Sequence, residues 1–467
     1  MMPMFPRFAA AALLLASLSP ALATGLLPGQ EPAAANPILP GYYGDPSVVS
    51  FEGKHYVYAT LDPWGDKTLG CWESADWKNW SYRVLAWPTK AACTSPESGG
   101  NGVWAPSVVR APDGRFLMAV SVGNEVWLGI ADHPLGPWRN VLGDKPFITR
   151  NFRPGFHMID AELFVDDDKS VYVYWGSGLA WKNGHCFVAR LNADFTGFAD
   201  EPRDVTPTHY FEGPMMVKRH GKYFLTYSNG ITVKDTYQVH YAVGDNPYGP
   251  FTEPDNSPIL VTDKSRNVIS PGHHTVFQEG GKDYILYHRH SIPFDPKFIS
   301  RQACVDELSI TADGRIAKVT PTHQGPALVQ GKAEAKALSF GATVTASSQA
   351  TEHNLPAFVV DANYATRWAA APAEKGAWLQ MDLGSVKAIG SQALRFEYAW
   401  KPYRFTVQAS DDAKTWRAVA DFTKTPAVGS PIEVKEAVKA RYLRLVFPED
   451  VAGSSISLFE WSVEAAR

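Results

Sequence analysis

The stretch Asp45-Pro46-Ser47-Val48-Val49 begins a pattern that the chain repeats four more times. The pattern consists of a polar or small residue, a small pair and a short β-rich run, followed by a turn and a second β-rich run, here His55-Tyr56-Val57-Tyr58. Successive copies are 52 to 61 residues apart, which is enough for four short strands and their turns. The later copies begin at Ala105, Asp160, Glu212 and His273.

The repeats predict the fold. Hairpin signals lie at the centre of each copy, and helical periodicity is nearly absent. Four-stranded sheets repeated around an axis make a β-propeller, so we expect an all-β fold with a five-bladed β-propeller. The first strand of each blade lines the central channel, and equivalent residues of the five copies should therefore meet at one mouth of that channel.

The equivalent positions hold Asp45, Ala105, Asp160, Glu212 and His273. Three ionised acids close together repel one another, so such a site costs stability unless a function or a cation compensates. Each acid alone is explained by a turn or a cap, but three in register favour a shared site. Glycosidic bond cleavage needs one protonated and one ionised carboxyl group, and a third carboxylate raises the pKa of the acid. The residue types alone leave the three roles open.

The same repeats resemble glycoside hydrolase family 43 over roughly residues 36 to 326. The resemblance implies that Asp45 is the general base that activates water, that Glu212 is the general acid, and that Asp160 tunes and orients Glu212. It also implies inversion at the anomeric carbon, with base and acid about 6.5–9.5 Å apart. The matching runs are Gly44-Asp45-Pro46-Ser47, Trp104-Ala105-Pro106-Ser107, Ile159-Asp160-Ala161-Glu162, Glu212-Gly213-Pro214 and Pro271-Gly272-His273-His274.

Other site residues follow from the resemblance. His273 matches a histidine that helps to hold a hydrated cation, often calcium, although hydrogen bonding without a metal explains it equally. Arg301 and His274 are predicted to contact the substrate, and Trp104 is predicted to form a ring-stacking wall. The alternatives are that Arg301 is a surface arginine and that Trp104 packs inside a blade. We expect the loops 62–66 and 182–185 to set specificity.

The repeat pattern ends near Gly325-Pro326, and a different composition begins near residue 338. The tail resembles a discoidin-like, coagulation factor 5/8 type C module, a β-sandwich jelly roll used by many carbohydrate-binding modules. The resemblance implies sugar contacts from Tyr398 and Trp400 and a structural calcium near Asp361, Thr366 and Glu460; a module that only packs is the alternative. The matching runs include Val360-Asp361-Ala362-Asn363, Thr366-Arg367-Trp368, Trp378–Gly384 and Ala440–Leu445.

The N-terminus predicts export. Arg7 precedes an apolar run that is too short to span a bilayer, and Ala21-Leu22-Ala23 supplies the small residues of a cleavage site. The chain is thus divided into a signal peptide (1–23), the propeller (24–329), a linker (330–337) and the discoidin-like module (338–467). We expect a secreted or periplasmic protein. In that compartment Cys71 and Cys93 could pair and close a loop, whereas Cys186 and Cys304 are expected to be free.

Composition narrows the partners. The net charge is −4 and the basic residues are not clustered, which argues against nucleic acid and anionic membranes. The 15 tryptophans suit stacking on sugar rings, although sheet cores explain most of them individually. We therefore predict an inverting exo-glycosidase without an organic cofactor that acts on plant-type oligo- or polysaccharides. α-L-Arabinofuranosides are favoured; β-D-galactofuranosidase, β-D-xylosidase and a non-catalytic sugar-binding propeller are the alternatives.

Overall fold

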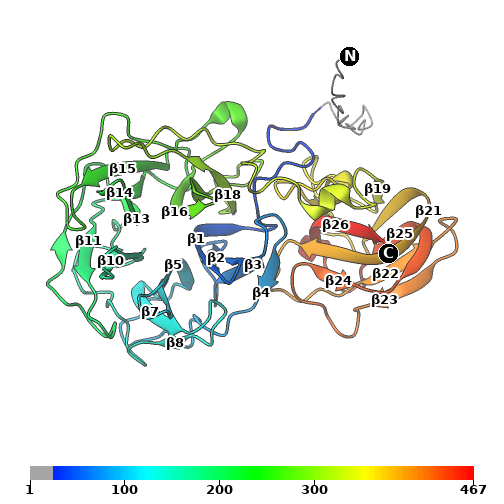
Figure 1. Ribbon diagram of the computed structural model, residues 1–467. Helices are drawn as coiled ribbons and strands as arrows, with labels where there is room; N and C mark the ends of the chain where they lie inside the picture. The colour runs from blue at the N-terminus through cyan, green and yellow to red at the C-terminus, as the bar shows by residue number, and fades with distance from the viewer. Residues whose placement is uncertain (1–24, 467) are drawn as a thin grey trace, which may run out of the picture.

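The computed structural model describes residues 25–466, so the predicted signal peptide lies outside the described residues. Five small antiparallel sheets form a ring, and a second all-β unit lies beside the ring next to its first blade (Figure 1). The prediction of a five-bladed propeller followed by a β-sandwich is confirmed. Within residues 25–466, no helix has the length and apolar character that crossing a membrane requires.

The first three blades have the four strands expected from the repeats, and the last two have three. The blades consist of β1 (Tyr43–Phe51), β2 (Lys54–Leu61), β3 (Gly70–Ser74) and β4 (Ser81–Arg83); β5 (Val103–Arg110), β6 (Phe116–Val122), β7 (Glu125–Ala131) and β8 (Arg139–Asn140); β9 (Glu162–Val165), β10 (Val171–Trp175), β11 (Phe187–Arg190) and β12 (Arg203–Asp204); β13 (Glu212–Arg219), β14 (Lys222–Asn229) and β15 (Gln238–Gly244); β16 (Gly272–Glu279), β17 (Lys282–His290) and β18 (Arg301–Leu308).

The ring is closed by the start of the described chain. The innermost strands contact one another in turn, from β1 through β5, β9 and β13 to β16, and β16 contacts β1 again. The segment before β1 also runs along β18, the outer strand of the last blade. The Ile38 amide donates to the Ala303 carbonyl at 2.9 Å, and the Asn36 side chain bonds both the carbonyl and the amide of Val305. Residues 36–38 thereby cover the outer edge of that blade.

A recurrent bulge shapes the innermost strands. In β1, β5, β13 and β16 the pairing register shifts after Gly44, Trp104, Glu212 and Gly272. The next residue has a positive φ in each case, and so does Asp160 just before β9; these residues are Asp45, Ala105, Asp160, Gly213 and His273. The prediction that Glu212 occupies the same position as Asp45 is therefore wrong by one residue. Gly213 is the equivalent of Asp45, and Glu212 lies one residue earlier, opposite Ser228.

The C-terminal module is a β-sandwich built around the long strand β21 (Trp378–Phe396). The first part of β21 pairs with β19 (Thr343–Ala346) and β25 (Val438–Val446), and its last part pairs with β24 (Ile432–Val434) and β26 (Ser457–Ala465). The remaining strands are β20 (Trp368–Ala369), β22 (Thr406–Ser410) and β23 (Arg417–Asp421). Short 3-10 helices occur at η2 (Lys264–Arg266), η3 (Ala333–Lys336), η4 (Pro356–Val360) and η5 (Gly453–Ser455).

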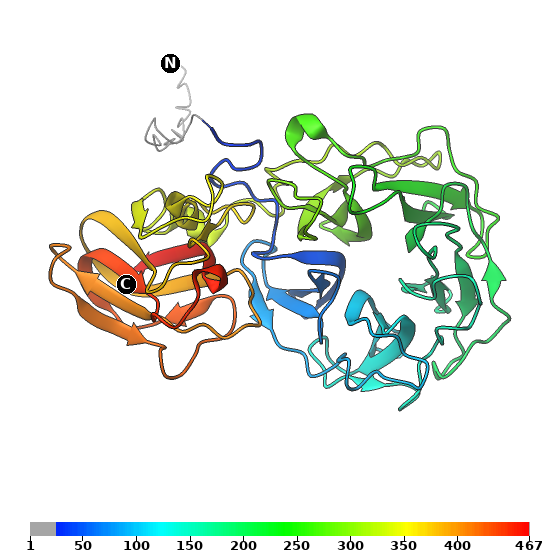
Figure 2. The ribbon, with the colours of Figure 1, turned by 180° about the vertical axis from the view of Figure 1, so that it is seen from behind.

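The segment predicted as a linker is packed between the two units. Lys332 and Glu334 are buried, and the Glu334 carboxylate binds Arg395 at 2.8 Å. Arg395 also donates to the Trp80 carbonyl of the propeller at 2.9 Å. Figure 2 shows this side of the molecule from behind, with the module against the first blade. Arg395 thus contacts both the linker segment and the propeller, and breaking its ion pair with Glu334 would leave a charge buried and unpaired.

The two tail aromatics predicted to contact sugar lie instead against the propeller. The Tyr398 ring meets Tyr42 edge-on at 6.4 Å, and the Trp400 ring meets Tyr43 at 6.3 Å. Trp400 is partly buried with the core of the first blade. The sequence marked them as loop aromatics correctly, but the surface that they serve is the interface between the units, because the neighbouring blade offers them an apolar face.

All four cysteines are buried and unpaired. The considered Cys71–Cys93 disulfide is absent; the Cys93 thiol faces Asn140 Oδ1 at 3.7 Å instead. Cys186 and Cys304 are free, as predicted. Several tryptophans, including Trp72, Trp127 and Trp175, are fully buried in the blades, which confirms that packing explains many of them.

Candidate active site

A pocket of about 430 Å³ lies at one mouth of the propeller channel. The polar residues and the aromatic residues of its wall come from all five blades and from the loops between them. Asp45, Asp160, Glu212 and His273 all line it, so the structure brings together the four polar residues that the repeats singled out. The other lining residues are Trp64, Asn101, Trp104, His157, Ile159, Ser177, Gly178, Ala180, Trp181, Phe211, Thr232 and Arg301.

Asp45 is held as a carboxylate by several donors. Its Oδ1 accepts from Arg301 Nη1 at 2.6 Å and lies 3.0 Å from His273 Nδ1, and its Oδ2 accepts from the Thr60 hydroxyl at 2.7 Å. Burial alone would raise the pKa of Asp45, but the positive charges of Arg301 and His273 outweigh burial and hold this pKa well below 3.8. Asp45 is therefore ionised at neutral pH, as a base must be.

Arg301 anchors Asp45 to the wall of the pocket. Its guanidinium also donates from Nη2 to Asp62 Oδ1 at 2.7 Å, so one arginine joins two buried carboxylates. Gly44 makes this possible, because a Cβ at position 44 would lie 2.1 Å from the Arg301 Cζ. Arg301 is thus buried rather than on the surface, and it lines the pocket as the resemblance implies.

Replacing Gly44 with alanine is expected to lower kcat/KM by about 100-fold, because displacing Arg301 misplaces Asp45 by a fraction of an ångström or more. Steady-state kinetics on an aryl glycoside will measure this. Gly100→Ala is the matched control, since a Cβ there meets no atom within 4 Å. Equal activities of the two variants would contradict the packing role of Gly44.

Glu212 and Asp160 form the acidic side of the pocket. Glu212 Oε1 accepts from the Tyr237 hydroxyl at 2.7 Å, and Oε2 accepts from the Ser177 hydroxyl at 2.9 Å. Burial raises the pKa of Glu212 above 4.5, although Tyr237 and His273 oppose this. Burial also raises the pKa of Asp160 to about 8, with further contributions from the charges of Glu212 and Asp45. At neutral pH the proton therefore resides on this pair and not on Asp45.

Two histidines surround Asp45 in different protonation states. Burial lowers the pKa of His273, but Asp45, Asp160 and Glu212 raise it to about 9, so this ring is cationic. Burial and Arg301 hold the pKa of His288 well below 6.5, so this ring is neutral, and its Nδ1 accepts from the Asp45 amide at 3.1 Å. His288 also stacks on Tyr237 with ring centroids 5.8 Å apart. It links the surroundings of Asp45 with those of Glu212.

The other sequence predictions have mixed outcomes in the structure. Trp104 is half-buried in the pocket wall, on β5. His274, predicted to contact substrate, is buried and bonds the Thr226 hydroxyl at 2.7 Å, away from the lining residues. Within the loop 62–66 Trp64 reaches the pocket, whereas the second wall loop is 177–181 rather than 182–185.

Sequence reasoning missed the residues that orient the carboxylates: Thr60, Asp62, Ser177, Tyr237 and His288. They come from second strands or from loops, where the repeats differ from one another. The sequence does contain a signal for His288, which directly follows the second β-rich run of the fifth repeat. Pairing of the two runs of that repeat sets His288 opposite Gly272, next to His273.

This arrangement can support hydrolysis without a covalent sugar intermediate. One carboxylate is ionised and fixed by an arginine, and a carboxyl group whose pKa is raised by burial faces the same pocket from another blade. Such a pair can deprotonate water on one side of a glycosidic carbon and protonate the leaving oxygen on the other.

Comparison with known proteins places these features in a family. Residues 34–316 match the model of glycosyl hydrolases family 43, and residues 358–445 match a NedA-like, galactose-binding domain. A β-D-galactofuranosidase from Aspergillus niger is 31% identical over 309 residues, which cover 62% of this chain and 86% of that protein. A xylosidase/arabinosidase from Bacteroides ovatus is 29% identical over 340 residues, which cover 60% of this chain and 95% of that protein.

The two-unit architecture is also found in a solved structure. A protein described as a glycoside hydrolase has a TM-score of 0.77 and 27% identity, and the match covers 94% of this chain and all of the other. The family match covers more than half of the chain and includes the five blades and every pocket residue. The chain belongs to glycosyl hydrolases family 43.

Proposed function

We propose that this glycosidase is an inverting, exo-acting furanosidase whose first candidate substrates are α-L-arabinofuranosides at the ends of plant-type oligo- or polysaccharide side chains. The observation that carries the proposal is the division of charge in one pocket: Arg301 keeps Asp45 ionised while burial favours the protonated form of Glu212. In this proposal Asp45 takes a proton from the attacking water, and Glu212 gives its proton to the leaving oxygen.

Asp160 is assigned a tuning role. Burial and the negative charges of Glu212 and Asp45 raise the pKa of Asp160 to about 8, so Asp160 and Glu212 compete for negative charge in the same part of the pocket, and neither loses its proton easily while the other is ionised. Ser177 and Tyr237 hold the two Glu212 oxygens from opposite sides and so fix the direction in which the acid points.

A panel of aryl glycosides tests the proposal. We expect turnover of the p-nitrophenyl α-L-arabinofuranoside, and proton NMR of the first-formed sugar should show the inverted anomer. Retention would contradict the assignment of Asp45 as a base. No turnover on any panel member, on arabinan or on xylan would favour a sugar-binding propeller without catalysis.

β-D-Galactofuranosides are the second candidate substrates. The A. niger relative carries that activity in its name, and the two furanoses share ring stereochemistry and differ in the group at C5. A higher kcat/KM on the p-nitrophenyl β-D-galactofuranoside than on the arabinofuranoside would reverse the order of the two.

An aromatic pair at the rim of the pocket is suited to the second sugar of the substrate. Trp64 and Trp181 are 49% and 39% exposed, with ring centroids 6.3 Å apart and planes inclined by 56°. Trp181 also stacks on Phe211, with centroids 5.8 Å apart, which holds its ring in place. Exposed indoles beside a catalytic pocket offer apolar faces for sugar rings at little ordering cost.

Replacing Trp181 with alanine is expected to raise KM for an oligosaccharide about tenfold and to leave kcat nearly unchanged, because stacking holds substrate and transition state equally. The aryl glycoside, which lacks the second sugar, should be less affected. Trp181→Phe keeps an aromatic face and should restore most of the affinity. An equal change in KM for both substrates would contradict the second-sugar role.

The proposal includes a calcium ion beside His273. Because Nδ1 of His273 faces Asp45, Nε2 is the ring nitrogen that a cation would bind, and the cation would have to displace the Nε2 proton of the cationic ring. Calcium takes six to eight oxygen ligands, so this residue fits only a cation whose other ligands are mainly water. Such an ion would add positive charge to a pocket that holds three carboxylates.

A second calcium ion is proposed in the module, near Asp361, Thr366 and Glu460. Glu460 Oε1 is buried and has no hydrogen-bond partner within residues 25–466, and burial raises the pKa of both carboxyl groups well above their ordinary values. A buried, unpartnered carboxylate oxygen beside a second carboxylate fits a hard cation.

Removing and restoring calcium tests both sites. Elemental analysis of the reloaded protein should give two calcium ions per chain, and Glu460→Gln should hold one. The reloaded wild-type protein should also melt at a higher temperature than the stripped protein, because an ion that binds only the folded state stabilises it. A reloaded sample without calcium would contradict both sites.

Export from the cytoplasm is part of the proposal, with cleavage after Ala23. The basic residue, apolar run and small cleavage residues of the N-terminus support it. N-terminal sequencing of the mature protein tests it, and a sequence that begins at Met1 would contradict it.

A further inference from the structure

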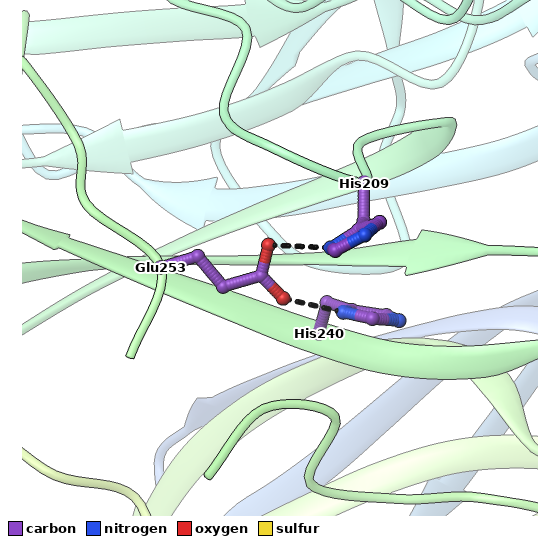
Figure 3. A group of neighbouring side chains, drawn as sticks. All are labelled: His209, His240 and Glu253. Carbon is purple, nitrogen blue, oxygen red and sulfur yellow. Dashed lines mark hydrogen bonds and ion pairs between the residues drawn. The ribbon is translucent and has the colours of Figure 1, made fainter. Parts of the chain in front are cut away.

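Two histidines and one glutamate meet in the fourth blade, outside the catalytic pocket. His240 lies on β15, Glu253 follows that strand, and His209 lies in the segment that leads into β13. Figure 3 shows the Glu253 carboxylate with one oxygen toward each imidazole. The ligand atoms of these three side chains all lie within 4.8 Å of one another, and no other group of three histidine, cysteine, aspartate or glutamate side chains among the described residues meets this criterion.

The distances are close to those of a metal centre. Glu253 Oε2 lies 3.0 Å from His209 Nδ1, and Oε1 lies 2.6 Å from His240 Nδ1. Ligands about 2.0–2.2 Å from a tetrahedral zinc ion are roughly 3.3–3.5 Å from one another. Small movements of the side chains would therefore admit an ion among the three ligand atoms.

The chemistry of the donors selects the metal. Two imidazole nitrogens and one carboxylate suit zinc, which is commonly bound by histidine with aspartate or glutamate, and they suit calcium poorly, since calcium prefers an all-oxygen shell. The side chains of His240 and Glu253 are 5% and 8% exposed, whereas that of His209 is 62% exposed. The site thus has a buried floor and one open side, where the ion could enter and a water could complete the coordination.

The surroundings of His240 also fit. A histidine that binds metal through Nδ1 needs an acceptor for its Nε2–H, and the Gln238 amide lies 2.9 Å from Nε2. The oxygen and nitrogen of an amide are assigned from the hydrogen-bond network, and turning this amide over places its oxygen opposite Nε2–H. When zinc binds Nδ1 of a neutral His240 ring, the single ring proton moves from Nδ1 to Nε2, where the turned Gln238 amide accepts it.

The position of His209 gives the site a consequence for the pocket. His209 has a positive φ of 58°, and three residues later the chain reaches Glu212; Phe211 between them lines the pocket. Asn229 already holds the His209 carbonyl at 2.6 Å. We infer that His209, His240 and Glu253 form a zinc site that fastens the segment preceding Glu212 to the outer part of the fourth blade.

Titration of the metal-stripped full-length protein with Zn²⁺ tests this inference. Calorimetry should show one site that is lost in His209→Ala, and saturating Zn²⁺ should raise the melting temperature by about 3–5 °C. His209 is the suitable residue to change, because its side chain is 62% exposed and its loss is expected to leave the fold intact. With Co²⁺ in place of Zn²⁺, the visible absorption should have the intensity of a four-coordinate ion.

His220→Ala is the matched control, since His220 is also an exposed histidine with a positive φ and lies outside the group. This variant should bind Zn²⁺ like the wild type. The inference is overturned if Zn²⁺ does not bind the wild type, or if it binds His209→Ala and the wild type equally. Glu253 then only bridges two imidazoles by hydrogen bonds. These readouts do not use glycoside turnover, so they are independent of the proposed furanosidase activity.

Discussion

Replacing Asp45 with asparagine is expected to lower kcat/KM by about 10,000-fold, the upper range for losing a general base. An amide cannot accept the proton of the attacking water, and the two nearest titratable side chains of the pocket cannot replace it as a base: His273 is cationic, and Asp160 holds its proton to about pH 8. The loss should be similar for aryl glycosides and for natural oligosaccharides, because the attacking water needs a base whichever group leaves.

The measurement is kcat/KM on both substrate types, with Asp66→Asn as the control. Asp66 is an exposed acid of the neighbouring loop and is not among the lining residues of the pocket. A residual activity within tenfold of the wild type would assign the base to another residue. Circular dichroism of the Asp45→Asn variant should accompany the kinetics, since this substitution leaves Arg301 with only Asp62 as its ionic partner.

Replacing Glu212 with glutamine is expected to lower kcat/KM by different factors for substrates with poor and with good leaving groups. With a poor leaving group, such as a sugar alcohol, kcat/KM should fall by about 1,000-fold, because the oxygen leaves without a proton. With a good leaving group, such as dinitrophenolate, the loss should be far smaller. Glutamine still accepts from either Tyr237 or Ser177, so the shape of the pocket is kept.

The pH dependence gives a second test of Glu212. The acid must be protonated, so wild-type kcat/KM should fall as the pH rises through the raised pKa of Glu212. The base must be ionised, and because the pKa of Asp45 is lowered, kcat/KM should stay constant at acidic pH until the pH is well below 3.8. In Glu212→Gln the alkaline fall should weaken for the good leaving group. Equal losses on both kinds of leaving group would contradict the assignment of the acid.

The propeller could be predicted from the sequence because each blade repeats one hairpin pattern. Asp45, Asp160 and His273 could be predicted because the bulge sets them at one position of each blade. Glu212 was found although its register was wrong by one residue: glycine occupies the bulge of the fourth blade, and the carboxylate stands just before it. Periodicity gives the strands, but only pairing shows where a bulge adds a residue.

Residues outside the repeats were harder to predict. The contact of Arg301 with Asp45 joins positions 256 residues apart, and only the closed ring brings them together. The contacts of Tyr398 and Trp400 depend on where the module lies against the first blade, and no local sequence pattern specifies that position. Exposed-looking aromatics in a loop have the same composition whether they meet a sugar or another part of the chain.

The segment 36–38 along β18 has a consequence for how the protein is made. Asn36 and Ile38 are synthesised early, yet their partners Val305 and Ala303 emerge from the ribosome more than 260 residues later. Joining the two ends of the ring requires closure of almost the whole propeller, with the entropy cost of a long loop and the slow kinetics of non-local pairing. The segment 36–38 therefore has no strand to pair with until Ala303 and Val305 have been made, and during that time its unpaired backbone groups can pair with other chains instead.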